Sequence, residues 1–147
     1  MTGEVSEQLK NEAEVYRLAC LYARGADRRD AAIWNAILTD DIVLVTPAIT
    51  LTGRDKVVAS LDMLGRMFVA TQHRIHNQLY SFEGDRATGE TYSTADHVIE
   101  GEEGSRKLLS WALRYEDELR HDGSSWRFSR RTLHLDWSEE RPLPPAS

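Results

Sequence analysis

The chain has 147 residues, of which 41% are hydrophobic and 29% charged, with 24 acidic against 18 basic side chains and a net charge of −6. These values are typical of one globular domain with its own core, and they exclude a disordered or collagen-like chain. The acidic balance argues against a nucleic-acid-binding protein, because phosphates are held by clustered lysine and arginine side chains. The single Cys20 excludes an intrachain disulfide and a cysteine-rich metal site.

No apolar stretch is long enough to span a bilayer, and the start MTGEVSEQLKNE lacks the apolar core of a signal peptide. We therefore expect a cytoplasmic protein that binds neither membrane nor nucleic acid. No repeat or linker interrupts the chain, which predicts a single domain over residues 1–147 with a core of about 8–137. Residues 138–147 are rich in proline and are expected to form an extended tail.

Helical periodicity occupies the first half of the chain. Apolar residues recur every three or four positions between about Glu7 and Arg24, which predicts a helix that ends at Gly25. Asp27 or Asp30 can cap a second helix. The elements expected after it are a strand over 42–45, a short partner strand over 50–52 and a helix over about 55–68.

The periodicity changes to two from Gln72 onward, which predicts long strands. These strands are expected over about 72–82, 87–100, 108–120 and 126–137, with glycine-containing turns between them. Helices followed by antiparallel strands are typical of the α+β class. We expect the three helices to cover one face of a strongly bent sheet and to enclose a pocket.

His73 falls on a strand face that is expected to carry Ile75, Asn77 and Leu79 as well. A histidine on such a face is costly to desolvate without a partner, and a single one is more often structural than catalytic. His76 alternates to the other face, and no nearby carboxylate completes a set of ligands. We therefore expect no metal site.

Asp27 lies just beyond Gly25, where its simplest role is to cap the second helix. If Asp30 caps that helix instead, Asp27 is free to face inward. Tyr22 precedes Asp27 by five residues, so the two side chains converge only if the first helix ends between them.

Asp96 and His97 are neighbours on one predicted strand and therefore face opposite sides of the sheet. Bulges shift this alternation in curved sheets, so the periodicity does not choose which of the two faces inward. Arg131 is out of step with Trp126 and Phe128, which indicates a bulge in the last strand as well. Taken singly, each of these polar residues is more often structural.

Two series of residues become informative when they are considered together. They are Tyr22-x4-Asp27-x2-Asp30, Trp34, Asp40-Asp41 and Gly53-Arg54, and then His73-x-Ile75-x-Asn77, Gly84-Asp85-x-Ala87, Tyr92, Arg114-Tyr115-x-Asp117 and Gly123 to Trp126-x-Phe128-x2-Arg131. This pattern resembles SnoaL-like proteins of the NTF2-like superfamily over about residues 8–137. The resemblance implies a cone-shaped α+β barrel, with three N-terminal helices packed in a strongly curved, mainly antiparallel sheet and a deep pocket at the open end.

Within that superfamily the chain is most similar to cofactor-free lyases such as bile acid 7α-dehydratase and scytalone dehydratase. The pocket of the former carries a tyrosine, an aspartate, a histidine, a second aspartate and an arginine, which match Tyr22, Asp27, His73, Asp96 and Arg131. Scytalone dehydratase has a second histidine where Asp96 falls. The resemblance thus implies a dehydratase-like enzyme that needs no cofactor.

The chemistry of elimination suits these side chains. A base is needed near an acidic C–H, and histidine has an ordinary pKa of about 6.5. Asp27 is the candidate carboxylate that orients His73, in the way an aspartate orients the histidine of a serine-protease triad. Tyr22 and Arg131 are candidate donors to an enolate oxygen or a leaving hydroxyl. Asp96 is expected to anchor the leaving group or to pair with His73.

The expected pocket lining is mainly apolar, which suits a hydrophobic small molecule of polycyclic, terpenoid or aromatic type. The predicted lining residues are Trp34, Thr46, Leu64, Met67, Phe68, Asn77, Trp111 and Tyr115. An isomerase or polyketide cyclase, and a non-catalytic ligand-binding or dioxygenase small-subunit-like module, are alternatives on the same scaffold. Two activities of related proteins are disfavoured. Thr46 stands where the catalytic aspartate of ketosteroid isomerase would fall, and the lysine typical of hexachlorocyclohexane dehydrochlorinase, a more distant relative, is not evident near Tyr22. The resemblance also implies a homo-oligomer, a trimer or a dimer, formed through the outer sheet face.

Overall fold

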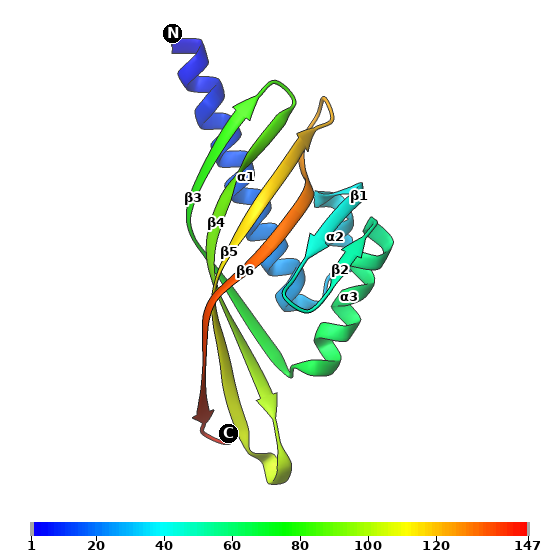
Figure 1. Cartoon of the computed structure of the whole chain (residues 1–147), viewed down its shortest axis with the longest axis vertical. Helices are drawn as coiled ribbons and strands as arrows, with labels where there is room; N and C mark the ends of the chain where they lie inside the picture. The colour runs from blue at the N-terminus through cyan, green and yellow to red at the C-terminus, as the bar shows by residue number, and fades with distance from the viewer. Residues whose placement is uncertain (1, 147) are drawn as a thin grey trace.

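The computed structural model describes residues 2–146 (Figure 1). The elements in chain order are α1 (Thr2–Arg28), α2 (Ala31–Ile37), β1 (Leu38–Val45), β2 (Thr50–Thr52), α3 (Arg54–Met67), β3 (Ala70–Glu83), β4 (Arg86–Glu100), a 3-10 turn (Glu102–Gly104), β5 (Arg106–His121) and β6 (Trp126–Leu143). The α+β class and the order of the elements are as predicted. Every helix within the described residues is too short or too polar to cross a membrane.

The six strands form one sheet in the order β2-β1-β6-β5-β4-β3. The strands β3 to β6 pair as antiparallel neighbours, whereas β1 pairs with β6 in parallel. The sheet is therefore mainly antiparallel, as expected. The sheet is strongly twisted and curved (Figure 1). Because β2 and β3 are its two edges and do not pair over the described residues, it is open rather than a closed barrel.

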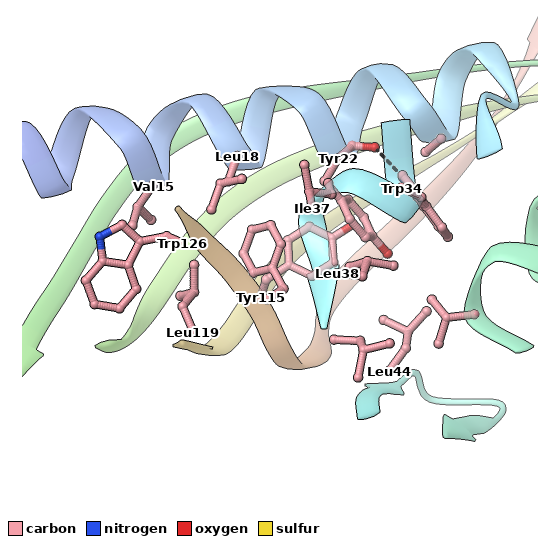
Figure 2. Close-up of a cluster of buried hydrophobic side chains, with 14 of the residues drawn as sticks. Val15, Leu18, Tyr22, Trp34, Ile37, Leu38, Leu44, Tyr115, Leu119 and Trp126 are labelled. Atoms are coloured by element: carbon pink, nitrogen blue, oxygen red, sulfur yellow. Dashed lines mark hydrogen bonds between the residues drawn. The ribbon is translucent and has the colours of Figure 1, made fainter. Parts of the chain in front are cut away.

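The helices cover one face of the sheet over part of its length, and α1 crosses behind β3 to β6 in the view of Figure 1, where the end of β4, the start of β5 and the end of β6 extend beyond the helices. The buried cluster between these layers includes Val15 and Tyr22 of α1, Trp34 of α2 and Tyr115 and Leu119 of β5 (Figure 2). The two β5 residues are four positions apart, so they point to the same face of the sheet. Burial of this apolar surface is the main force that holds α1 and α2 on the strands.

The first helix is longer than predicted, because α1 continues through Gly25 and ends at Arg28. The prediction that Gly25 ends this helix is therefore wrong. Gly25 has a packing role instead: a Cβ atom at this position would overlap the indole ring of Trp34. Since α1 is unbroken between them, Tyr22 and Asp27 lie about 140° apart around its axis and do not converge.

Asp30 is the cap of α2. Its carboxylate accepts hydrogen bonds from the backbone N–H groups of Ala32 at 3.0 Å and Ile33 at 3.3 Å. Of the two capping residues considered from the sequence, Asp30 thus takes this role, and the carboxylate of Asp27 is free for other contacts.

A bulge in β3 reverses which residues face the helices. The register of β3 against β4 shifts between Ile75 and Gln78. His73 and Ile75 are partly buried before the shift, whereas Asn77 is exposed and Leu79 has an exposed fraction of 78% after it. The prediction that Asn77 and Leu79 share the face of His73 is wrong, because a bulge changes the alternation of side chains.

The last strand is six residues longer than predicted and continues to Leu143. Residues 138–143 pair with β5, where Ser138 lies opposite Trp111 and Pro142 opposite Lys107. Proline is tolerated here because this end of β6 pairs with β5 alone, so the other edge of the strand needs no N–H donor. The proline-rich tail therefore begins as a strand, and residues 144–146 belong to no helix or strand.

Candidate active site

Asp27 at the end of α1 and His73 on β3 form the hydrogen-bonded pair at the centre of the site. Nδ1 of His73 lies 2.6 Å from Oδ1 of Asp27, and the backbone N–H of His73 donates to Oδ2 over 2.9 Å. The hydroxyl of Thr71 also donates to Oδ1, over 3.0 Å. The exposed fractions of the two side chains are 9% for His73 and 22% for Asp27. Three donors on one carboxylate, two of them from His73, hold the pair in a single arrangement.

This geometry fixes the tautomer of the His73 imidazole. An ionised carboxylate only accepts hydrogen bonds, so Nδ1 of His73 must carry the hydrogen that it shares with Asp27. Nε2 then has a free lone pair, and it makes no hydrogen bond within residues 2–146. A neutral imidazole oriented in this way can take a proton at Nε2, and the carboxylate then stabilises the imidazolium.

His97 on β4 faces inward beside this pair. Its ring centroid is 6.1 Å from that of His73, 4.5 Å from that of Phe68 and 4.9 Å from that of Trp111. Nδ1 of His97 donates to the carbonyl of Leu109 over 3.0 Å, because a carbonyl can only accept, so Nε2 is free here too. Burial lowers the pKa of His97, which favours its neutral form near pH 7.

Asp96, which was predicted to join the catalytic group, lies on the opposite face of the sheet. Ala95 pairs with His73, so Ala95 shares the face of His73 and Asp96 does not. The carboxylate of Asp96 accepts from the Ser110 hydroxyl at 2.6 Å and from Arg74 at 2.8 Å. Burial alone would raise the pKa of Asp96, but these two hydrogen bonds outweigh it and lower the pKa. The assignment of Asp96 to the site is corrected: it holds cross-strand pairs on the outer face.

Arg131 and Tyr22 belong to a second, deeper group. Arg131 is fully buried, and its Nε and Nη2 donate to the carboxylate of Asp117 over 2.8 and 3.0 Å. The hydroxyl of Tyr80 donates to the same carboxylate over 2.6 Å. The guanidinium carbon lies 4.4 Å from the ring centroid of Tyr22 and 3.8 Å from that of Tyr115. Within the described residues, Nη1 of Arg131 is a buried donor without a partner.

The charges of this second group act on the tyrosines that surround it. Burial opposes the charge of Arg131, but the adjacent Asp117 outweighs that effect and raises the pKa of the guanidinium. Burial raises the pKa of Tyr115 to about 12; Arg131 opposes this shift, while the charges of Asp117 and Asp27 add to it. The two groups are therefore close enough to interact through their charges, although no hydrogen bond joins Tyr22 to Asp27 within residues 2–146.

The other predicted lining residues are divided between the site, the core and the surface. Phe68 and Trp111 flank His97. Trp34 is a core residue whose indole stacks on Tyr22 at 4.6 Å and donates to the Tyr22 carbonyl over 3.0 Å (Figure 2). The remaining positions are Tyr115 beside Arg131 in the core, Leu64 at the edge of the core, Thr46 hydrogen-bonded to Ile49 in the turn after β1, Met67 with an exposed fraction of 57%, and exposed Asn77.

Thr46, Met67 and Asn77 thus do not reach the Asp27–His73 pair. Thr46 is bound in its turn, Met67 points outward at the end of α3, and Asn77 follows the bulge of β3. Their assignment as lining residues is corrected.

A groove of about 320 Å³ between α1 and β3, the α1–β3 groove, leads to the Asp27–His73 pair. Its lining residues are Tyr16, Cys20, Ala23, Arg24, Asp27, Arg28, His73 and Ile75. The groove mixes apolar and cationic side chains, unlike the mainly apolar lining expected from the sequence. Within residues 2–146, the His, Cys, Asp and Glu side chains form no group of three that could hold a metal ion.

Two polar residues of the inner face, Asp117 and Tyr80, were not predicted as site residues, although Asp117 is part of the pattern that resembles the SnoaL-like proteins. Asp117 lies on β5 at even spacing from Leu113, Tyr115 and Leu119, all of which are buried. This spacing can be recognised in the sequence, because it places an aspartate on the same strand face as three apolar residues. A carboxylate on a buried face needs a buried partner, such as Arg131. Tyr80 could not be placed from the sequence, because the bulge of β3 decides its face.

Comparison with known sequence families decides the relationship, because the SnoaL-like domain matches residues 7–132. The chain belongs to the SnoaL-like family. The matched segment of this SnoaL-like chain extends from α1 into β6 and contains both the Asp27–His73 pair and the Arg131–Asp117 pair. No curated protein matches the sequence.

Solved structures similar to this SnoaL-like chain include a candidate scytalone dehydratase from Novosphingobium aromaticivorans, with a TM-score of 0.82, 21% identity and coverage of 97% of this chain and 95% of that one. A type 2 hexachlorocyclohexane dehydrochlorinase is similar with a TM-score of 0.80, 21% identity and coverage of 93% and 91%. A Mycobacterium tuberculosis protein of unknown function has a TM-score of 0.78, 25% identity and coverage of 90% and 75%. These similarities show the fold, and function has to be argued from the site.

Proposed function

We propose that this SnoaL-like protein is a cofactor-independent lyase, of dehydratase type, in which His73 is the base. The observation that carries the proposal is the 2.6 Å hydrogen bond between Asp27 and Nδ1 of His73, because in the neutral imidazole it leaves the lone pair of Nε2 free to accept a proton. The similarity of the scaffold to a candidate dehydratase and to a dehydrochlorinase supports this proposal, since both names describe eliminations.

In the proposed reaction, Nε2 of His73 takes a proton from a carbon next to an activating group, and the electrons of the C–H bond form the new double bond. The bond to the leaving hydroxyl breaks, and the proton passes from the imidazolium to that hydroxyl, so that water leaves and His73 returns to its neutral form. Asp27 stabilises the imidazolium between these steps. His97, neutral and 6.1 Å away, can accept a hydrogen bond from the substrate at its own Nε2.

Nη1 of Arg131 is the donor that we propose for a substrate oxygen on which negative charge develops. It is buried and without a partner in the described part of the chain, and a preorganised donor of this kind stabilises an oxyanion well. Tyr22 packs against the same guanidinium and orients it.

The proposed substrate is a hydrophobic small molecule of polycyclic, terpenoid or aromatic type. The rings of Phe68 and Trp111 beside His97, and the side chains of Ala23 and Ile75 in the α1–β3 groove, provide apolar contact surface. A few convergent polar groups within such a lining are typical of small-molecule sites.

Product mass tests this function. We expect the purified protein to convert at least one member of a panel of hydroxylated polycyclic, terpenoid and aromatic compounds to a product that is lighter by the mass of water. His73→Ala is expected to lower that turnover by about 10²–10⁴-fold. A product of unchanged mass would indicate an isomerase or a cyclase instead, and binding without turnover would indicate a ligand-binding module.

We also propose that the protein is a cytoplasmic homo-oligomer, a trimer or a dimer, associated through the outer sheet face. This face carries Leu79, Tyr92 and Trp137, with exposed fractions of 78%, 39% and 70%. The helices lie on the other side of the sheet and leave this face uncovered (Figure 1). Large apolar side chains on an uncovered face are typical of protein interfaces. Sedimentation equilibrium measures the state directly, and Trp137→Lys is expected to shift it toward the monomer.

A further inference from the structure

Arg29 has a backbone conformation that is unusual for a residue other than glycine. It follows α1 with φ of 52°, in the left-handed region that favours glycine. The backbone N–H of Arg29 donates to the carbonyl of Ala26 at 3.3 Å, and that of Asp30 donates to the carbonyl of Gly25 at 2.9 Å. These two bonds form the helix-ending motif in which glycine is the usual residue at this position.

The side chain of Arg29 spans three elements. Its Nη1 donates to the carbonyl of Ala26 on α1 and, over 2.8 Å, to the hydroxyl of Thr71 on β3. It passes over α3 at Gly65, where a Cβ atom would already lie 3.6 Å from Nε of Arg29. The arginine is therefore held between α1, α3 and β3 and is only partly exposed to solvent.

Thr71 connects this guanidinium to the site. Its hydroxyl accepts from Arg29 and, because a hydroxyl has one hydrogen to give, donates that hydrogen to Oδ1 of Asp27 over 3.0 Å. The same Oδ1 atom accepts from Nδ1 of His73. An unbroken chain of hydrogen bonds thus runs from Arg29 through Thr71 and Asp27 to His73.

We infer that Arg29 is a positioning residue for the proposed base, acting through Thr71 to orient the Asp27 carboxylate and to balance its charge. The inference rests on the proposed function of the Asp27–His73 pair. It explains why a residue with a side chain stands where the backbone favours glycine: the contact with Thr71 requires that side chain.

The substitution Arg29→Gly separates this role from a structural one, because the two roles predict opposite effects. Glycine relieves the backbone conformation, so the melting temperature is expected to stay the same or rise. Removal of the cation beside Asp27 leaves the carboxylate less balanced, which favours the protonated His73 imidazole. We therefore expect the midpoint of the His73 ring titration, followed by NMR without substrate, to move to higher pH.

With a turned-over substrate, Arg29→Gly is expected to lower kcat by about 5-fold or more with little change in KM, since Arg29 is outside the groove lining. Thr71→Val, which removes the intermediate hydroxyl, should move the ring titration and kcat in the same way. Arg17→Ala is the matched control, because it removes the same charge from an exposed position of α1.

An Arg29→Gly protein whose ring titration matches that of Arg17→Ala would overturn the inference. A fall in melting temperature with an unchanged titration would also overturn it, because Arg29 would then only stabilise the helix end. If no substrate is turned over by the wild type, the proposed lyase function fails, whereas the NMR titration still decides whether Arg29 acts on His73.

Discussion

Asp27 is the residue on which the proposed chemistry depends most closely after His73 itself. Asparagine at this position would present an amide in place of one carboxylate oxygen and could no longer stabilise an imidazolium by charge. We predict that Asp27→Asn lowers kcat by about 10²–10⁴-fold while the melting temperature changes little. Asp30→Asn is the matched control, since asparagine caps helices as well as aspartate does and turnover should be retained.

The buried pair of Arg131 and Asp117 is the second residue-scale feature that can be tested. Asp117→Ala leaves a fully buried guanidinium without its partner, which is expected to destabilise the fold by about 3–5 kcal/mol in urea unfolding. The pair of Arg114 and Asp136 at the surface provides the control, because solvent screens it and Asp136→Ala should cost much less stability than Asp117→Ala. Equal losses in the two variants would mean that the buried pair is not specially important to stability.

At the scale of the elements, Gly25 decides how closely α1 approaches α2. Helix propensity alone predicts that Gly25→Ala stabilises α1 by about 1 kcal/mol. The contact with Trp34 predicts the reverse, because the added methyl group overlaps the indole ring. We expect a lower melting temperature for Gly25→Ala, and none of that loss for Gly3→Ala, where the added methyl group meets nothing within 4 Å.

The helices and strands also show which features of the fold the periodicity of the sequence can predict. The helices and strands were predicted in the right order because each carries a clear period of 3.6 or two residues. The inward face of β3 was predicted correctly at His73 but not at Asn77, because one bulge lies between them and leaves no mark in the composition. The helix end at Arg28 was missed because Gly25 has two possible uses, and only the position of Trp34 shows that packing is the one used.

The Asp27–His73 pair of the candidate site was predictable from the sequence, because it depends only on how α1 lies against β3. Asp27 and His73 meet because α1 contacts the edge strand, and an inward Asp27 follows once Asp30 caps α2. The choice between Asp96 and His97 was not predictable, because neighbouring strand residues differ only in which face is covered. That face is fixed by the packing of the helices, which no local pattern contains.

For the whole molecule, the buried His97 predicts how stability depends on pH. Its folded pKa is lowered by burial, so between that value and the unfolded value of about 6.5 the unfolded chain binds more protons. The contribution of neutral His97 to stability is therefore fully present above about pH 6.5 and is lost as pH falls toward the folded pKa of His97. We expect His97→Gln to flatten the decline of urea stability between pH 7 and pH 5, whereas exposed His76→Gln should not.

The central claim is that Nε2 of His73, oriented by Asp27, removes the proton that starts the elimination. Chemical rescue tests this most directly: turnover by His73→Ala is measured with increasing imidazole in the buffer. We predict that imidazole restores part of the lost activity in proportion to its concentration and more effectively as the pH rises through about 7, where the free base predominates. Full turnover by His73→Ala without imidazole would contradict it.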